Sequence, residues 1–399
     1  MNKEKKIVPQ LRFPEFEKEG EWKVKKLSAV CILKAGTFVK ASEIIEHQRS
    51  GLFPCYGGNG LRGYTSTFTH EGDYSLIGRQ GALCGNVTFV KEKFHATEHA
   101  VVTTPKDKID TKWLFYELVR ANLNQYATGQ AQPGLSVSNL ENVKITVPQN
   151  PAEQQKIAAC LSSLDEVITA ESEKLDLLQD HKKGLLQQLF PAEGETQPKF
   201  RFPEFKDDGE WEETTLGKIT KVISVRNKEN KKLPVYSISN KDGFVPQSEQ
   251  FEGVDSSDRG YDISLYKVIG KNTFAYNPAR INIGSIGYSA NLSDIIISSL
   301  YVCFKTTQNV NDWFLWYFFQ TNLFTQAVSD NVEGGIRNYL FYNNFSIIKF
   351  HLPQIEEQQK IAACLSAADE LIDAQAQKIE ALKAHKKGLL QQLFPNNND

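Results

Sequence analysis

The sequence predicts an α+β protein that is built twice. Two globular domains are joined by two long helices, which we expect to pack on each other as an antiparallel coiled coil with a pseudo-twofold internal repeat. Three observations in the 399 residues predict this fold. A 39-residue helical stretch occurs twice, a short motif occurs twice upstream of it, and the segments between hold many short β-branched runs with Gly and Asn turns.

The N-terminal motif is the first repeated element in chain order. Residues 11–16 (LRFPEF) return as residues 200–205 (FRFPEF), at an offset of 189 positions. A polar stretch with Pro and Gly, residues 192–199, precedes the second motif and predicts a linker. The expected organisation is a first domain at residues 1–150, a long helix at 151–191, a second domain at 192–354 and a second long helix at 355–399.

The two globular parts share landmarks although their sequences differ. Trp113 and Trp313 each open an aromatic helical stretch, which we take as equivalent positions. A β-branched segment precedes each helix, a Gly-rich turn precedes that segment, and a strand leads from each domain into the following long helix. This mixture of short strands and few helices, without βαβ alternation, favours the α+β class.

The long helical stretch begins at Glu153 and again, 204 positions later, at Glu357, and 27 of the 39 aligned residues are identical. Its apolar residues recur in alternating steps of four and three, which is typical of a heptad seam. Polar residues interrupt both seams at the same two repeat positions, Glu171 and Lys182 in the first copy and Gln375 and Lys386 in the second. These matching interruptions favour helices that pack on each other; two independent surface helices are the alternative. The residues expected in the seam are Ile157, Leu161, Leu164, Ile168, Leu175, Leu178, Leu185, Leu189, Ile361, Leu365, Ile372, Ile379, Leu382, Leu389 and Leu393.

The length of these helices predicts their direction. At about 1.5 Å per residue, each helix spans roughly 57 Å. A domain of about 150 residues has a radius of gyration near 15 Å, so it is too compact to carry the chain back along a parallel helix. Antiparallel packing removes this problem and places the two domains at opposite ends of the helix pair.

Composition excludes several classes of protein. No apolar run approaches the length of a membrane span, and the charged N-terminus has no apolar core of a secretory signal, so we expect a cytoplasmic protein without membrane contact. The six cysteines form no CxxC pair and are expected to be isolated buried thiols. The net charge of −2 is a mild argument against a simple DNA-binding module.

The contrast between helices and domains carries functional information. Two nearly identical helices in one chain indicate one kind of partner surface that is used twice. Two divergent domains indicate two different ligands. Because antiparallel helices would hold these domains at a fixed separation, a regular polymer such as B-form DNA is the natural ligand.

The order of these elements resembles the specificity subunit of type I restriction-modification systems. The resemblance covers nearly the whole chain and is carried by the repeated helix end HKKGLLQQLFP, the Pro-Gln dipeptide shortly before each EQQKIA, and the turn FAYNPAR at residues 274–280. It implies that each domain is a target recognition domain for one half of a bipartite, asymmetric site in double-stranded DNA. It also implies that the helices set the gap and dock two modification (methyltransferase) subunits, which restriction subunits join.

The resemblance further implies that this chain has no catalytic residues and binds no cofactor. Adenine methylation and DNA cleavage would belong to the partner subunits, which would bind S-adenosylmethionine and ATP with Mg²⁺. A non-catalytic scaffold that binds proteins through its two domains is the alternative from another class. Methyl transfer by this chain itself is a third.

Three local patterns would favour enzymes instead. Residues 95–99 (HATEH) fit the H-x-x-E-H pattern of zinc peptidases, but the residues that follow are typical of a strand, whereas that metal site needs a helix. Residues 277–280 (NPAR) resemble the Asn-Pro-Pro-aromatic motif of amino methyltransferases but lack its second Pro and its aromatic residue. The fragment Glu21-Trp22-Lys23 offers part of a nuclease motif, although its repeat copy has Glu in place of Lys and no partnered Asp is evident. We therefore predict neither a metal site nor a catalytic residue.

Candidate DNA-reading residues are the polar and aromatic side chains of Gly- and Asn-rich stretches. Such stretches are also typical of plain turns, so the sequence identifies the DNA-reading stretches better than the single residues that contact DNA. Lys182, Lys183, Lys386 and Lys387 could contact DNA between the half-sites, but we interpret them as solvated helix charges. The candidates are Tyr56, Asn59, Arg62, Tyr64, Arg79, Gln80, Gln130, Gln132 and Ser136 in the first domain, and Arg226, Lys228, Asn240, Lys241, Asn277, Arg280, Asn282, Arg337, Asn338 and Tyr339 in the second.

Overall fold

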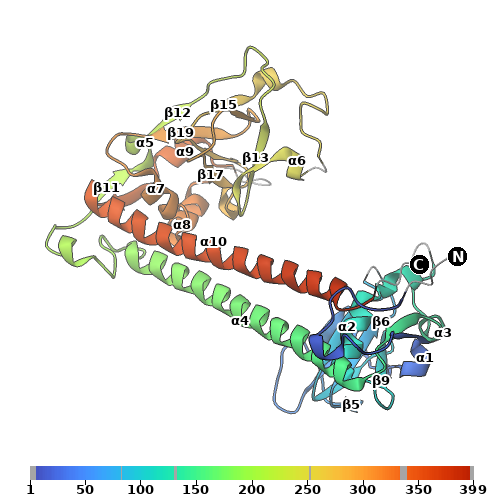
Figure 1. Ribbon diagram of the computed structural model, residues 1–399. Helices are drawn as coiled ribbons and strands as arrows, with labels where there is room; N and C mark the ends of the chain where they lie inside the picture. The colour runs from blue at the N-terminus through green and yellow to red at the C-terminus, as the bar shows by residue number, and fades with distance from the viewer. Residues whose placement is uncertain (1–5, 82, 130–132, 251–252, 333–338, 396–399) are drawn as a thin grey trace. The chain divides into compact units, whose positions relative to one another are not determined.

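A computed structural model describes residues 6–81, 83–129, 133–250, 253–332 and 339–395 of the chain (Figure 1). The chain divides into two compact units. Unit 1 consists of residues 1–173 together with residues 376–399, and unit 2 consists of residues 174–375. Each unit therefore holds one globular domain, one half of the helix that follows it in sequence, and one half of the other long helix.

Unit 1 opens with the repeated N-terminal motif and continues through short strands to the start of the long helix α4 (Pro151–Leu189). Its elements are η1 (Pro14–Phe16), β1 (Lys23–Lys26), α1 (Leu27–Val30), β2 (Cys31–Ala35), η2 (Ala41–Glu43), β3 (Phe53–Gly57), β4 (Gly60–Thr65), β5 (His70–Glu71), β6 (Tyr74–Gly78), β7 (Val87–Val90), β8 (Lys93–Ala96), β9 (Ala100–Pro105), α2 (Thr111–Arg120), η3 (Leu123–Tyr126), α3 (Val137–Glu141) and β10 (Lys144–Val147).

Unit 2 repeats this order and ends in the first half of the long helix α10 (Ile355–Gln392). Its elements are η4 (Pro203–Phe205), β11 (Glu212–Thr215), α5 (Leu216–Ile219), β12 (Thr220–Ile223), β13 (Val235–Ser239), β14 (Gly243–Pro246), α6 (Gln247–Gln250), η5 (Ile263–Leu265), β15 (Lys267–Ile269), β16 (Phe274–Tyr276), η6 (Ile281–Ile283), β17 (Ile286–Tyr288), β18 (Ile295–Ile297), β19 (Val302–Thr306), α7 (Asp312–Phe318), α8 (Asn322–Asn331), α9 (Tyr342–Ser346) and β20 (Lys349–Leu352).

The sheets of the two units have the same topology. Unit 1 has four-stranded sheets in the orders β2-β9-β6-β7 and β4-β3-β8-β5, and unit 2 has β12-β19-β16-β17 and β14-β13-β18-β15. Among the strand pairs that the structure describes, β3 with β8 and β13 with β18 are parallel, while the others are antiparallel. A two-stranded ribbon, β1 with β10 or β11 with β20, brings the start of each domain to its end. The mixed sheets agree with the predicted absence of βαβ units.

The aromatic helix of each domain begins at a side-chain cap. Asp110 accepts a hydrogen bond from the backbone N–H of Trp113, and Asn311 accepts one from that of Phe314. The caps show that Trp113 corresponds to Phe314, so the predicted equivalence of Trp113 and Trp313 is wrong by one residue. Trp113 is buried, whereas Trp313 is exposed. Trp313 lies one residue before Phe314, the counterpart of Trp113, and a shift of one residue along a helix turns the side chain away from the core.

The core of each unit lies between the aromatic helix, the sheet β2-β9-β6-β7 or its counterpart, and the long helices. In unit 1 Trp22 and Trp113 pack against Phe394, which follows α10. In unit 2 Trp211 and Phe314 pack against Phe190, which follows α4. Each domain core therefore contains the end of one long helix, and the identical ends of the two repeats are explained by this packing.

Six cysteines are free thiols, and four of them (Cys31, Cys55, Cys84 and Cys303) are buried. This burial confirms the prediction for those four, while Cys160 and Cys364 are half-buried on the long helices. Across the described residues, none of the helices is both long enough and apolar enough to cross a lipid bilayer.

Candidate functional site

In unit 1 three of the predicted stretches lie together at the ends of the strands. The turn between β3 and β4 contacts the loop after β6: a Cβ atom added to Gly78 would lie 2.1 Å from the carbonyl oxygen of Gly58. Leu135 donates its N–H to the carbonyl of Arg79 at 2.8 Å, and Gln80 forms an isolated β-bridge with Gly134. Residues 56–64, 78–81 and 133–136 therefore form one surface, which we call loop cluster 1.

The exposed polar side chains of loop cluster 1 are those of Asn59, Arg62 and Gln80. The methylene groups of Arg62 lie against the backbone of Gly57, where a Cβ atom would come within 2.6 Å of Arg62 Cδ. Gly57 thus leaves room for the arginine stem, and the guanidinium stays in solvent. Such a group can form two parallel hydrogen bonds to a base edge or a phosphate.

Other predicted residues of this cluster fix its shape. Arg79 is half-buried, and its Nη1 donates to the carbonyl of Glu98 at 3.1 Å. Ser136 caps α3 by accepting the N–H of Asn139. Tyr56 and Tyr64 are half-buried; Tyr56 packs edge-on against Phe94, and burial raises its pKa. Gln130 and Gln132 lie outside the described residues.

Unit 2 brings the corresponding stretches together in the same way. The carbonyl oxygen of Asn240, in the turn between β13 and β14, lies 2.8 Å from where a Cβ atom of Gly284 would be. Leu340 donates its N–H to the carbonyl of Pro278 at 3.0 Å. Residues 239–243, 277–285 and 339–340 form this surface, which we call loop cluster 2.

The exposed polar side chains of loop cluster 2 are those of Asn240, Lys241, Asp242, Arg280 and Asn282, and the carboxylate of Asp242 accepts a hydrogen bond from Ser239 Oγ. Asn277 is half-buried, and its Oδ1 accepts the N–H of Ala279, so this side chain shapes the turn. The ring of Tyr339 stacks on that of Phe341, with centroids 5.6 Å apart. Arg337 and Asn338 lie outside the described residues.

Two predicted residues do not join loop cluster 2. Arg226 forms a β-bridge with Lys267 in β15, which is the edge strand opposite β14 in its sheet. Lys228 follows buried Asn227, whose side chain holds this turn by donating to the carbonyl of Lys231. Both Arg226 and Lys228 are exposed, but they belong to a different edge of the domain.

The pattern that would favour a zinc peptidase falls in an unsuitable place. His95 lies in strand β8, where its Nε2 is 3.2 Å from the carbonyl oxygen of Thr37 and its Nδ1 is 3.0 Å from Thr67 Oγ1. The H-x-x-E-H residues are therefore not on one helix face. In the part of the chain that the structure describes, no three His, Cys, Asp or Glu side chains are grouped so that they could hold a metal ion.

Each domain is fixed to its own long helix by a buried ion pair whose residues are not among the predicted ones. In unit 1 the guanidinium of Arg12 forms two 2.8 Å hydrogen bonds to the carboxylate of Glu153, which also accepts from Trp22 Nε1. In unit 2 Arg201 forms the same bidentate pair with Glu357. The signal was available, since Arg and Glu recur at both copies of their repeats.

A second repeated contact joins the aromatic helix to both long helices. In unit 1 Tyr116 donates to Asp165 at 2.7 Å, and Lys386 binds the other oxygen of the same carboxylate. The Lys386 Nζ also lies 5.4 Å from the Tyr116 ring centroid. Burial, followed by the hydrogen bond to Asp165, raises the pKa of Tyr116, so the hydroxyl remains a donor.

Unit 2 repeats this contact with the helices exchanged. Tyr317 donates to Asp369 at 2.8 Å, and Lys182 Nζ lies 2.6 Å from the other carboxylate oxygen. Lys182 and Lys386 are thus bound in ion pairs, and the interpretation of these two residues as solvated charges is wrong. Lys183 and Lys387 are exposed, as expected.

Each of the predicted seam residues is buried or half-buried. The structure buries Ile157, Leu161, Leu189, Ile361, Leu365, Ile379 and Leu393, and half-buries Leu164, Ile168, Leu175, Leu178, Leu185, Ile372, Leu382 and Leu389. Gln375, one of the polar interruptions, is also buried. This pattern is consistent with helices that pack along the predicted face.

A family model, curated relatives and solved structures all match the same protein family. The model of the type I restriction modification DNA specificity domain matches residues 19–180 and 208–384. The type I restriction enzyme EcoprrI specificity subunit of Escherichia coli is 47% identical over 156 residues, which are 39% of this chain and 38% of that subunit. The MjaVIII specificity subunit of Methanocaldococcus jannaschii is 26% identical over 400 residues, covering 91% of each chain.

Solved structures show the same fold. The chain is similar to the crystal structure of a type I restriction-modification system S subunit from M. genitalium, with a TM-score of 0.63 and 17% identity over 98% of this chain and 99% of that one. A second structure, described as the structural basis of complex assembly and conformational transition of the type I R-M system, gives a TM-score of 0.56 and 15% identity over 94% and 98% of the two chains.

Proposed function

Since the chain belongs to the type I restriction-modification specificity subunits, we propose that loop clusters 1 and 2 each read one half of a bipartite, asymmetric DNA site. One observation carries this proposal: the two clusters occupy the same place in the same sheet topology, yet they expose different side chains. Asn59, Arg62 and Gln80 would meet one sequence, and Asn240, Lys241, Arg280 and Asn282 another. Such residue types read base edges in the major groove.

The exposed chemistry suits recognition rather than bond breaking. The clusters offer amide and cationic donors, which bind bases and phosphates. We therefore propose a non-catalytic subunit that binds no cofactor and acts in the cytoplasm. Partner modification subunits would methylate adenine with S-adenosylmethionine, and restriction subunits would use ATP and Mg²⁺.

We further propose that α4 and α10 form an antiparallel pair that sets the gap between the half-sites. Contacts inside unit 1 support this direction, because Asp165 and Glu171 of α4 bind Lys386 and Lys378 of α10, in reversed chain order. Their nearly identical outer faces would dock two copies of the modification subunit.

The gap is tested by lengthening both helices together. Seven residues, two helical turns, are inserted after residue 173 and seven at the equivalent position after residue 377. The helix pair would grow by roughly 10 Å, and the gap by about three base pairs. The recognised site is determined by sequencing methylated DNA from cells that carry the variant with its modification and restriction subunits.

Two controls separate the parts of the proposal. An insertion in α4 alone should prevent assembly, since the Asp165–Lys386 and Lys182–Asp369 pairs could no longer both form. Exchange of residues 11–147 for another recognition domain should change one half-sequence and leave the gap and the other half unaltered. A matched insertion that leaves the gap unchanged would exclude the helices as its determinant.

A further inference from the structure

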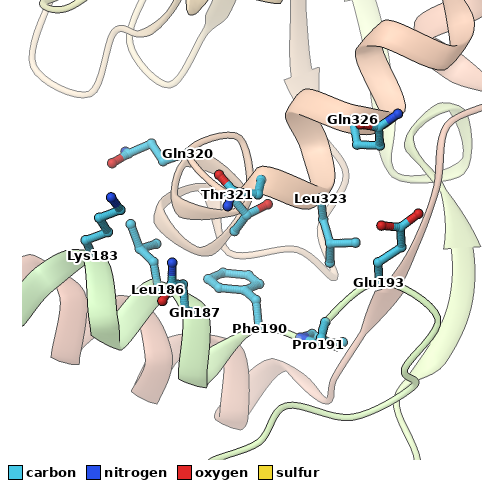
Figure 2. Close-up of a pocket in the computed structure, with 12 residues that line it drawn as sticks. Lys183, Leu186, Gln187, Phe190, Pro191, Glu193, Gln320, Thr321, Leu323 and Gln326 are labelled. Carbon is cyan, nitrogen blue, oxygen red and sulfur yellow. The ribbon is translucent and has the colours of Figure 1, made fainter.

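Unit 2 contains a cavity of about 380 Å³ that the proposed function does not use (Figure 2). It lies between the last turns of α4 and the connection from α7 to α8. Leu186 and Gln187 line it from α4, and Phe190 lines it just after the end of that helix. Gln320 and Thr321 line it from the connection, and Leu323 lines it from the first turn of α8. Figure 2 shows the Phe190 ring below Thr321, with Lys183 on one side and Glu193 on the other.

The cavity arises where the two domains differ in helix length. The aromatic helices α2 and α7 begin at the equivalent caps Asp110 and Asn311, but α7 ends at Phe318 after seven residues, whereas α2 has ten residues and ends at Arg120. Arg120 lies ten residues after its cap, and the residue ten positions after the cap in unit 2 is Thr321. The shorter helix and the shorter side chain leave a cavity beside Phe190, whose own ring is 3% exposed.

Unit 1 shows what this place accepts. Phe394 is the repeat counterpart of Phe190, and the guanidinium of Arg120 lies 5.6 Å from its ring centroid. Two 2.8 Å hydrogen bonds from Arg120 to Glu117 hold the guanidinium there. Glu117 is fully buried, and its counterpart in unit 2 is Phe318, so unit 2 has neither the cation nor its acid.

We propose that the cavity of unit 2 binds the guanidinium of an arginine side chain that a protein subunit docking on α4 presents. The guanidinium would lie against Phe190, as that of Arg120 lies over the ring of Phe394. The carboxylate of Glu193 supplies the opposite charge, and the amide oxygens of Gln187 and Gln320 supply acceptors. A planar guanidinium suits this arrangement better than an ammonium, because it stacks and donates in its plane.

Electrostatics at the cavity are nearly balanced before the ligand enters. Lys183 is the one cation among the lining residues, and Figure 2 places it across Phe190 from Glu193. A guanidinium near Glu193 therefore gains the attraction of the carboxylate and stays away from the lysine. The inference rests on the proposed docking of a subunit on α4 but not on DNA reading, because no lining residue belongs to loop cluster 2.

The direct test is an isothermal calorimetric titration of the full-length chain with N-acetyl-arginine-N-methylamide. We expect saturable binding to one site. The citrulline analogue, which lacks the charge, should bind about tenfold more weakly, because hydrogen bonds to a charged group are the stronger ones. Free arginine should not bind more tightly than the capped form, since the proposed occupant is part of a polypeptide.

Matched variants locate the site. Gln187→Glu adds a carboxylate to the cavity and should tighten binding about two- to fivefold, whereas Glu193→Gln should weaken it by a similar factor. Gln391→Glu is the control, since Gln391 is the exposed repeat counterpart of Gln187 in unit 1 and should change nothing. None of these variants should alter the DNA sequence that is recognised.

The complex provides the last arm of the test. Binding of the capped arginine should disappear once the chain is saturated with its modification subunit, because the partner's side chain would then fill the cavity. The proposal is overturned by absence of saturable binding, by equal binding of the citrulline analogue, or by equal effects of Gln187→Glu and Gln391→Glu. Tighter binding of free arginine, or undiminished binding in the complex, would overturn a protein occupant.

Discussion

Asp165 on α4 binds Lys386 on α10 within unit 1, and the same two repeat positions meet again within unit 2 as Asp369 on α10 and Lys182 on α4. Each long helix thus contributes its aspartate to one unit and its lysine to the other. A shift of either helix along its axis would break these pairs. We propose that the lysine interruptions in the apolar seam, Lys182 and Lys386, fix the register of the two helices through these pairs.

The Asp165–Lys386 pair should show measurable coupling. We expect a double-mutant cycle with Asp165→Ala and Lys386→Ala to give about 1 kcal/mol, at the upper end for exposed pairs, because both side chains are partly buried and Tyr116 orients the carboxylate. Chemical denaturation provides the free energies of unfolding.

Lys383 and Glu380 provide the matched control for this cycle. They form a 2.8 Å ion pair within α10, but both are well exposed, so their coupling should be close to zero. Coupling of the same size in both pairs would show that Asp165 and Lys386 act as ordinary surface charges.

The Arg12–Glu153 pair should be far more costly to break. Glu153 is 1% exposed and Arg12 is 9% exposed, so removal of the arginine leaves a buried carboxylate without its charge partner. We expect Arg12→Ala to lower the free energy of unfolding by about 3 kcal/mol, as measured by urea denaturation.

Arg12→Lys and Arg201→Ala complete that experiment. Lysine keeps the charge but loses the bidentate geometry, so its cost should lie between those of wild type and Arg12→Ala. Arg201→Ala should have a similar cost, because Arg201 is equally buried against Glu357. A loss below about 1 kcal/mol in both alanine variants would contradict the proposed anchoring role.

Buried thiols should resist alkylation well above neutral pH. Burial raises the pKa of Cys31 to about 12 and that of Cys303 to about 12, from an ordinary value of 9.0. The protonated thiols therefore favour the folded state, and this contribution is lost only as the pH rises from 9 towards 12. At pH 9.5 iodoacetamide should leave both residues unmodified in native protein, as mapped by mass spectrometry.

The denatured chain is the control for the alkylation experiment. In concentrated guanidinium chloride all six cysteines should react, since none is in a disulfide. Modification of Cys31 or Cys303 in the native protein at the rate seen in denaturant would contradict their burial.

The long helices could be predicted because their signal is repeated over many turns. A heptad pattern across 39 residues, present in two copies, leaves little room for another structure. The aromatic helices are shorter, and alignment on Trp113 and Trp313 selects the wrong register. Side-chain caps at Asp110 and Asn311 decide the register, and their effect depends on local backbone geometry.

Roles of single polar residues were harder to predict. Lys182 and Lys386 look like ordinary helix charges in sequence, and their partners Asp369 and Asp165 are about 190 and 220 positions away. Likewise, convergence of the stretches in each loop cluster depends on the order of strands in two sheets, which sequence does not specify. A polar residue in a Gly-rich stretch can read a ligand or hold a turn, and only its contacts distinguish the two.

Arg62 and Arg79 illustrate that distinction and give the last prediction. Arg62 extends into solvent from the β3–β4 hairpin, so Arg62→Ala should leave the free energy of unfolding within about 0.5 kcal/mol of wild type. It should weaken DNA binding of the assembled methyltransferase by about 1–3 kcal/mol and relax the half-sequence that we propose unit 1 reads.

Arg79→Ala should lower the stability of the domain without directly removing a DNA contact, the reverse of the effects expected for Arg62→Ala. Its guanidinium donates to backbone carbonyls of Glu98 and Leu135, so truncation leaves half-buried acceptors unpaired and should lower the free energy of unfolding by about 1–2 kcal/mol. Any loss of DNA binding should follow from that destabilisation and be reduced at lower temperature. Mobility-shift titrations and denaturation on both variants separate the two roles. If Arg79→Ala alone relaxed the recognised sequence while the domain stayed stable, the assignment of reader and support would be reversed.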